Sequence, residues 1–256
     1  MNTNYPPATL FGAHTRLIPS SFVNEEYELS IWLPPSYETS AQRYPTLYVM
    51  DSPFAFGSAA EGALITSADV DAVPEMIVVG IGKQMEDREE WGTIRYRDYS
   101  PVPLPPPGSG QADAYLNFLE QECLPFIDTN YRTQPDDRLI FGNSLGGFFA
   151  VYTLFNKTHL FSRYIASVPS FVLWGTRLFD YEPALAAESL PHEARLFVSV
   201  GSLDHRYAPQ VFPFMEALTN RKLPNLKFQT LVIEGLGHMT AAMPALYYGL
   251  EAVYTM

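Results

Sequence analysis

The chain has 256 residues, a net charge of −12, 47% apolar residues and 17% charged residues. This composition is typical of a globular protein, and a chain of this length buries enough surface to fold without a metal or a disulfide. The charge argues against nucleic acid and anionic lipid as partners, because both are bound by clustered Lys and Arg and the sequence has no such cluster.

The N-terminal residues 1–7 contain neither a basic segment nor an apolar one. A secretion signal needs both, and a membrane span needs about 20 consecutive apolar residues, which occur nowhere in the sequence. We therefore expect a cytoplasmic protein without a membrane partner. The single cysteine, Cys123, excludes an internal disulfide and a multi-thiolate metal site, and we expect it to lie in the core.

Short β-branched or aromatic runs alternate with helical patterns along the chain. Residues 27–33 alternate in polarity and end at two prolines, which is typical of an outer antiparallel strand. Six further runs are almost continuously apolar, as in buried parallel strands: residues 46–50, 76–81, 138–141, 164–167, 196–200 and 228–233. Apolar residues at helical spacing predict four helices, at residues 112–130, 145–155, 209–222 and 241–255.

This alternation predicts a single α/β domain over residues 1–256, with a mostly parallel sheet and helices on both faces. Residues 101–110 carry five prolines and two glycines, so we expect a surface loop there, near the site. His and carboxylate side chains nowhere fall at metal-ligand spacing on one element, and a glycine-rich phosphate loop is absent. We therefore expect neither a metal nor a cofactor.

A serine motif stands between a predicted strand and a predicted helix, where Gly142 and Gly146 flank Ser144. This context is typical of the nucleophile of an α/β-hydrolase, because small neighbours let strand and helix approach and leave the hydroxyl exposed. The helix behind the turn offers the free amide of Leu145 to a developing oxyanion. The motif therefore predicts the α/β-hydrolase fold with Ser144 as the nucleophile.

A serine nucleophile needs a base, and in this fold an acid and then a histidine follow it along the chain. Asp204 comes just after one predicted strand and His238 follows the next, so both should lie at the sheet edge of Ser144. His205 is the rival base, and Asp180 is the next candidate acid. The other three histidines are expected at the surface: His14, His159 and His192.

Residues 44–51 (YPTLYVMD), 95–101 (RYRDYSP), 110–115 (GQADAY) and 142–147 (GNSLGG) resemble the esterase-D-like "putative esterase" family. The branch they resemble contains siderophore trilactone hydrolases and relatives of enterochelin esterase, and the similarity begins at about residue 27. It implies Ser144 as nucleophile, His238 as base and the Leu145 amide in the oxyanion hole. Some members use Glu at the position of Asp204 and some lack a working acid there.

The chain departs from the family pattern beside its predicted site. Asn143 replaces the usual His before the nucleophile, and Ser52-Pro53 replaces a glycine-containing pair in the oxyanion loop. Proline has no N–H to donate, so the second oxyanion donor should be the Phe54 amide or, as the second choice, Ser52. The chain also lacks the cationic patch that would suit an anionic ferric siderophore.

Aromatic side chains are expected where segments end or loop at the catalytic edge, and as a set they suggest a hydrophobic acyl or alcohol pocket. These residues are Phe54, Phe56, Trp91, Tyr96, Phe171 and Trp174. Arg95 and Arg97 could bind a substrate carboxylate or catecholate, or could pair with Asp98 or another acid. We therefore expect a serine esterase that hydrolyses a small carboxylic ester, such as a lactone or an aromatic or hydrophobic acyl ester, through an acyl-enzyme on Ser144. Acyl transfer by the same triad and binding without catalysis are the two alternatives.

Overall fold

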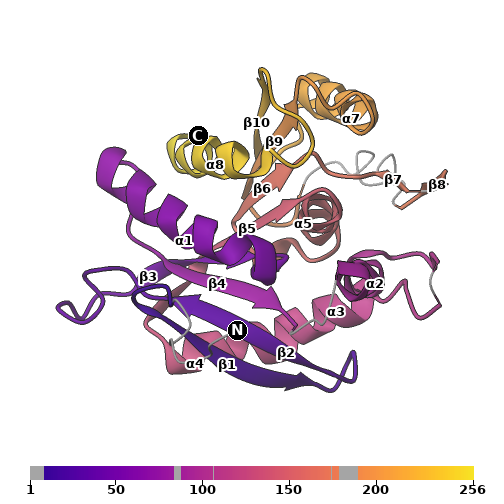
Figure 1. The fold of residues 1–256 in the computed structure, drawn as a ribbon. Helices are drawn as coiled ribbons and strands as arrows, with labels where there is room; N and C mark the ends of the chain where they lie inside the picture. The colour runs from indigo at the N-terminus through magenta and orange to yellow at the C-terminus, as the bar shows by residue number, and fades with distance from the viewer. Residues whose placement is uncertain (1–8, 84–87, 106, 174, 179–189) are drawn as a thin grey trace, which may run out of the picture.

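A mixed eight-stranded sheet forms the centre of the molecule (Figure 1). The structure is a computed structural model that describes residues 9–83, 88–105, 107–173, 175–178 and 190–256. In spatial order the strands are β1 (Ala13–Ser20), β2 (Glu25–Trp32), β4 (Ile77–Gly82), β3 (Tyr44–Val49), β5 (Thr133–Asn143), β6 (Arg163–Ser167), β9 (Ala194–Gly201) and β10 (Leu226–Ile233). Two neighbouring pairs at one edge of the sheet, β1–β2 and β2–β4, are antiparallel, and the other five pairs are parallel.

Helices cover both faces of the sheet, as the alternating pattern predicted. On one face α1 (Ser52–Asp69) and α8 (Ala242–Thr255) lie side by side (Figure 1). The other face carries a larger hydrophobic core beneath α3 (Ala112–Phe118), α4 (Leu124–Asn130), α5 (Leu145–Asn156) and α7 (Ala208–Arg221). A further helix, α2 (Arg88–Tyr99), packs against α3 and α5. No helix in the described part of the chain is both long enough and apolar enough to span a bilayer.

All seven predicted strands are present, but the predicted outer strand is not the outermost one. Residues 27–33 form most of β2, which β1 covers by antiparallel pairing along its length. The segment of β1 is partly polar and contains Pro19, so its pattern does not indicate a strand. An edge position tolerates this composition, because one side of the strand pairs with no neighbour.

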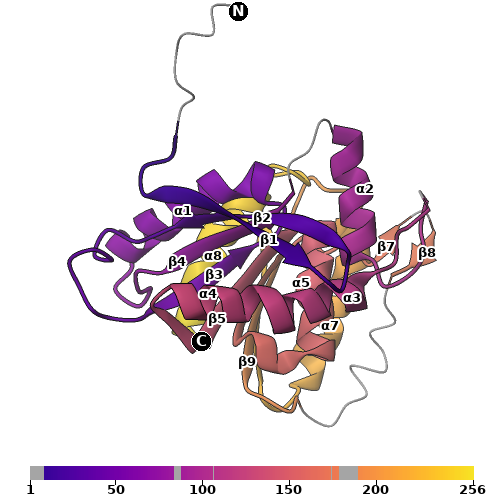
Figure 2. The same cartoon turned by 90° about the horizontal axis from the view of Figure 1, so that it is seen from below.

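The predicted helix over residues 112–130 is interrupted by a π-helical turn, Leu119–Cys123, between α3 and α4 (Figure 2). Pro125 lies in the first turn of α4 and has no N–H for the usual bond to the residue four before it. A π-turn changes this bonding locally, so the helix continues past the proline. Cys123 is fully buried in this turn, as expected for a core residue.

Two helices were not predicted. α1 begins at Ser52, in the segment expected to be the oxyanion loop, and Pro53 lies in its first turn, where a missing N–H costs nothing. Its buried residues are small, so the helix has no apolar stripe for a pattern to detect. α2 is mostly charged and polar, which hides it in the same way.

Two short strands, β7 (Val172–Leu173) and β8 (Thr176–Arg177), form a separate antiparallel pair. A 3-10 turn, η2 (Thr158–Leu160), follows α5. The described part of residues 101–110 is a loop, as predicted, and its end is bonded to the C-terminal end of α2: the Gly110 amide donates to the Tyr96 carbonyl.

Candidate active site

Ser144 lies on a sharp turn between β5 and α5. Its backbone has φ 59° and ψ −117°, a conformation that a residue with a side chain adopts only where its surroundings impose it. A Cβ atom on Gly142 would lie 2.2 Å from the backbone of Gly146, and one on Gly147 would lie 2.7 Å from the Ser167 carbonyl oxygen. The glycines are therefore required by the close approach of β5, α5 and β6 at this turn.

Asp204 and His238 meet at the same edge of the sheet. Asp204 follows β9 and His238 follows β10, and the Asp204 Oδ2 lies 2.6 Å from the His238 Nδ1. The other carboxylate oxygen, Oδ1, accepts the Tyr207 amide at 2.9 Å, and the Tyr207 ring lies 4.2 Å from the His238 ring between centroids. Asp204 is 4% exposed, so both of its oxygens are fixed by partners out of bulk water.

No hydrogen bond joins Ser144 to His238 in the described part of the chain. Met239, next to the histidine, lines a cavity together with Ser144, and its sulfur lies 3.9 Å from the Asn143 Nδ2. The Ser144 hydroxyl instead lies 3.1 Å from the Ser170 hydroxyl. Catalytic hydrogen bonds often form fully only when substrate is bound, so the absence of a Ser144–His238 bond here is compatible with a nucleophile and its base.

The starts of α5 and α1 face one another beside Ser144. A Cβ on Gly146 would lie 3.0 Å from the Asp51 Oδ2, so the two helix ends are in contact. The amides of Leu145 and Ser52 are the first of their helices, and neither has a hydrogen-bond partner among the described residues. Two free N–H groups at adjacent helix N-termini are suited to an oxyanion.

The expectation that Phe54 supplies an oxyanion amide is wrong in this structure. Its N–H donates to the Asp51 carbonyl at 3.0 Å, because residues 51–54 form the first turn of α1 and not a free loop. The Ser52 hydroxyl points toward β4 and not toward Ser144, since a Cβ on Gly80 in β4 would lie 2.5 Å from the hydroxyl oxygen. The Ser52 amide is therefore the free donor of this segment.

A cavity of about 180 Å³ opens beside Ser144. Asp51 and Arg95 line it and form an ion pair, with the Arg95 Nε 2.8 Å from the Asp51 Oδ1. Burial raises the pKa of Asp51, an effect that Arg95 partly offsets. The other lining residues are mostly apolar: Met50, Phe54, Ala55, Trp91, Phe141, Asn143, Met239, Ala242 and Met243.

Three of the eight residues in the predicted aromatic and arginine set line this cavity: Phe54, Trp91 and Arg95. The Arg95 guanidinium lies over the Trp91 ring, 4.5 Å from its centroid, and donates to the Asn143 carbonyl at 3.0 Å. Phe54 is 4.7 Å from the Trp91 ring between centroids. These three side chains therefore form one wall of the cavity.

The remaining residues proposed for substrate binding lie elsewhere. Arg97 pairs with Glu25 and Asp98, which corresponds to the alternative in which the arginine serves a structural ion pair. Phe56 packs against Gly80. Tyr96 packs against the core under α2, and Trp174 lies outside the described residues.

Other sequence expectations have similar outcomes. Phe171 is 2% exposed and packs against Phe214, so it belongs to the core. The described residues of the 101–110 loop do not line the cavity, and the expected place of that loop near the site stays a prediction. His205 is exposed, and Asp180, the alternative acid, is outside the described residues.

Several residues at the site were missed. Asp51, Met239 and Met243 reach the cavity from helix ends whose positions only packing decides. Ser170 follows β6, a predicted strand, and its place at a carboxyl end was the available signal. A cluster of three or more potential metal ligands does not occur among the described residues.

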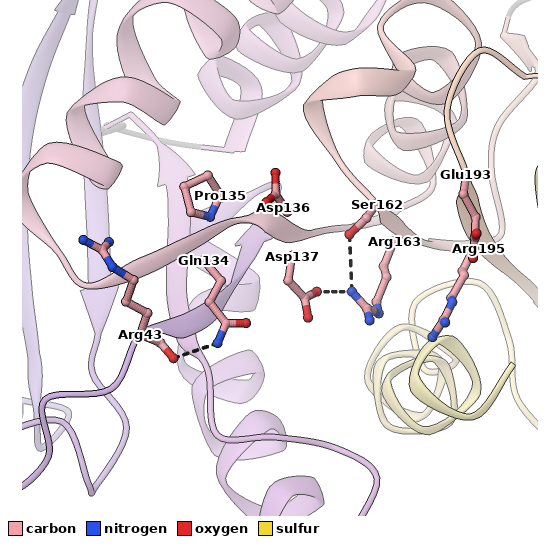
Figure 3. Close-up of a pocket in the computed structure, with 9 residues that line it drawn as sticks. All are labelled: Arg43, Gln134, Pro135, Asp136, Asp137, Ser162, Arg163, Glu193 and Arg195. Carbon is pink, nitrogen blue, oxygen red and sulfur yellow. Dashed lines mark hydrogen bonds and ion pairs between the residues drawn. The ribbon is translucent and has the colours of Figure 1, made fainter.

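A second cavity, of about 570 Å³, lies at the opposite edge of the sheet, where β5, β6 and β9 begin (Figure 3). Arg163 pairs there with Asp137, and Arg195 donates to the Val253 carbonyl at 3.0 Å. Its charged side chains balance in number, three basic and three acidic: Arg43, Arg163, Arg195, Asp136, Asp137 and Glu193. None of the predicted site residues lines this cavity.

Comparison with known proteins identifies relatives of the chain. It is 31% identical over 175 residues to the ferri-bacillibactin esterase BesA of Bacillus subtilis, covering 63% of this chain and 60% of that protein. It is 27% identical over 192 residues to the siderophore triacetylfusarinine C esterase of Aspergillus fumigatus, covering 73% and 62%. The chain thus spans about three fifths of the length of these curated relatives.

Solved structures share the fold over nearly the whole chain. The BES protein from Bacillus cereus matches with a TM-score of 0.87 at 26% identity, covering 99% of this chain and 98% of that one. The siderophore hydrolase EstA from Aspergillus nidulans matches with a TM-score of 0.81 at 19% identity, with 99% of each chain covered. The architecture is therefore the α/β-hydrolase fold. Since the model of the family described as "Putative esterase" matches residues 20–234, the chain belongs to that family.

Proposed function

We propose that the protein is a carboxylic ester hydrolase that works through an acyl-enzyme on Ser144. The observation that carries this proposal is the strained turn at Ser144 together with the Asp204–His238 pair at the same sheet edge. Membership of the esterase family and the ester-hydrolysing activities for which the relatives are named support it. The expected acid, Asp204, has the contact to the histidine that its role requires.

In acylation the Ser144 Oγ attacks the ester carbonyl carbon, while His238 takes the hydroxyl proton. The new Oγ–C bond gives a tetrahedral intermediate, which collapses when the bond to the alkoxy group breaks and His238 returns the proton to the departing alcohol. Water activated by His238 then releases the acid. Asp204 accepts a hydrogen bond from the Nδ1–H of His238, which directs Nε2 toward the reacting atoms and stabilises the imidazolium.

The oxyanion of each tetrahedral intermediate would be held by the amides of Leu145 and Ser52. Both are free donors at helix N-termini, and the two helix starts are in contact beside Ser144. One oxyanion donor is typically worth about 10²–10³ in turnover. In this arrangement Pro53 removes no needed donor, because the helical turn presents the amide before it.

The cavity suggests an ester whose acyl or alcohol part is uncharged and hydrophobic. Arg95 is compensated by Asp51 and by a backbone carbonyl, so it offers little attraction to an anionic substrate. The relatives named siderophore esterases make a lactone or an ester with an aromatic group the substrates to test first. The apolar lining favours the ester's neutral parts.

Replacement of the nucleophile tests the proposal. Ser144→Ala should lower p-nitrophenyl butyrate turnover by at least about 10⁴ and abolish covalent labelling by a fluorophosphonate, because it removes the hydroxyl proposed as the nucleophile. Peptide mass analysis of the labelled wild type should find the label on Ser144. Ser199→Ala is the matched control, since Ser199 is a fully buried serine in β9. Near-wild-type turnover by a folded Ser144→Ala variant would refute the mechanism.

A further inference from the structure

Ser170 is tied to the nucleophile twice. It lies in the loop after β6, is 1% exposed, and its amide donates to the Ser144 carbonyl at 3.1 Å. Its hydroxyl oxygen lies 3.1 Å from the Ser144 Oγ. Among the described residues, the Ser170 hydroxyl has no other hydrogen-bond partner than the Ser144 hydroxyl. This buried hydroxyl therefore depends on Ser144 for its hydrogen bond.

The backbone before Ser170 is held in an unfavourable conformation. Val168 has φ 40°, a value that a β-branched residue rarely adopts. Its side chain is fully buried and its amide donates to the Ser199 carbonyl of β9 at 2.7 Å. Such strain persists only where the surrounding packing determines the conformation. The loop is therefore fixed, and Ser170 with it.

The Ser170–Ser144 bond belongs to the free enzyme only. In that state the Ser144 hydroxyl shares a hydrogen bond with the Ser170 hydroxyl, in which either oxygen can be the donor, and it has none with His238 among the described residues. To react, Ser144 must give its proton to His238, and after acylation its Oγ is an ester oxygen that has no proton and accepts only weakly. The Ser170 hydroxyl is then left buried without a good partner, which carries an energetic cost.

We infer that Ser170 is a positioning residue that stabilises free Ser144 relative to the acylating transition state and the acyl-enzyme. This inference rests on the proposed acyl-enzyme mechanism. An interaction present only in the ground state slows the step that breaks it. Ser170 therefore slows acylation, and it leaves deacylation unchanged because that step begins after the bond is lost.

Ser170→Ala tests this role in the full-length protein. We expect kcat/KM for p-nitrophenyl butyrate, and the second-order rate constant of fluorophosphonate inactivation, to rise about threefold to tenfold, the worth of one neutral hydrogen bond. When deacylation limits turnover, kcat should stay within about twofold, so the gain appears as a lower KM. A purely structural serine would show a lower Tm and no such split between KM and kcat.

Ser199→Ala is again the control, because the Ser199 hydroxyl is buried without a partner and has no contact with the nucleophile. It should leave both rate constants at wild-type values. An unchanged or lower inactivation rate in Ser170→Ala would overturn the inference, while labelling of wild-type Ser144 would leave the proposed function standing. Absence of that labelling in the wild type would overturn both.

Discussion

At the scale of single residues, the site depends on atoms that are absent as much as on those present. Gly142 and Gly147 leave room for backbone that a Cβ would displace, and this room permits the unusual φ and ψ of Ser144. In the same way, Pro53 lacks an N–H exactly where a helix start needs none. These residues place the Ser144 hydroxyl and the free amides of Leu145 and Ser52.

The role of Asp204 is tested by removing its charge while keeping its size. Asp204→Asn should lower kcat by about 10²–10⁴, because an amide at this position favours the wrong tautomer of His238 and does not stabilise the imidazolium. The loss should be smaller than that in Ser144→Ala. Steady-state kinetics measure it.

Asp136→Asn makes the same chemical change at an exposed position on the opposite edge of the sheet, and it should have wild-type kinetics. If Asp204→Asn also kept wild-type turnover, the bond to His238 would have no part in catalysis. The protein would then resemble family members described as lacking a working acid.

At the scale of elements, ion pairs attach α2 to the antiparallel side of the sheet. Arg97 on α2 bonds Glu25 of β2 and Asp98, Lys83 pairs with the same Glu25, and the Tyr27 hydroxyl donates to Asp98 at 2.9 Å. This cluster holds the C-terminal half of α2. Through it, the helix that carries Trp91 and Arg95 is fixed beside the cavity.

The cluster should make stability depend on pH. Burial alone would raise the pKa of Glu25, but the bonds from Lys83 and Arg97 outweigh it and lower that pKa below its ordinary value of 4.5. A lowered carboxyl pKa contributes stability that is present above the unfolded-state value and is lost as pH falls through the folded-state value. Wild-type protein should therefore lose this contribution below about pH 4.5.

Glu25→Gln should lower the free energy of unfolding by roughly 1 kcal/mol at pH 7. The difference in unfolding free energy between this variant and the wild type should become smaller as the pH falls below about 4.5. Urea unfolding at a series of pH values measures this. Glu26→Gln changes the exposed neighbour and should do neither. A Glu25→Gln deficit that stayed constant down to pH 3 would show that packing, not charge, is lost.

At the scale of the whole molecule, the cavity is assembled from segments far apart in sequence. Its walls come from the starts of α1 and α8, one side of α2 and the end of β5. An engineered cavity of about 150 Å³ holds benzene, so the 180 Å³ here suits a group of about that size. The arrangement of helices therefore limits the size of any group that this cavity can hold.

This limit predicts how activity varies with substrate length. If the acyl part of the ester occupies the cavity, kcat/KM for p-nitrophenyl esters should rise as the acyl chain lengthens from two to about six carbons, and then level or fall. If the alcohol part occupies it, the same trend should appear with the length of the alkyl chain in a series of alkyl acetates. Each buried methylene contributes about 0.8 kcal/mol, roughly fourfold. Ala242 is the first residue of α8 and lines the cavity, so Ala242→Leu should fill part of it. The ratio of kcat/KM for the hexanoate ester to that for the acetate ester should then fall by about tenfold.

The ratio within one variant cancels any general loss of activity. Equal preference for all chain lengths in both series would show that this cavity does not bind the ester. A preference for esters with a carboxylate would show instead that the pairing of Arg95 with Asp51 breaks when substrate binds.

The sequence by itself determined seven of the eight strands of the sheet, the helices on residues 112–130, 145–155, 209–222 and 241–255, and the candidates Ser144, Asp204 and His238. The spacing of apolar residues along a strand or helix reflects which of its faces is buried, so it can be recognised from neighbouring residues alone. The serine motif likewise depends only on local turn geometry. Once the strands were known to be parallel, their carboxyl ends had to share an edge. This is why three residues separated by up to 94 positions (144 to 238) could be grouped without coordinates.

Tertiary structure alone decided the surroundings of those residues. The small-residue helix α1 has no apolar stripe, so its existence, and the loss of Phe54 as a donor, follow from packing against β4 and α8. Arg95 and Arg97 are two positions apart in one sequence motif, yet one lines the cavity and the other joins a distant ion-pair cluster, because successive helical residues face different directions. The direction of a side chain depends on neighbours from elsewhere in the chain, and no local pattern records them.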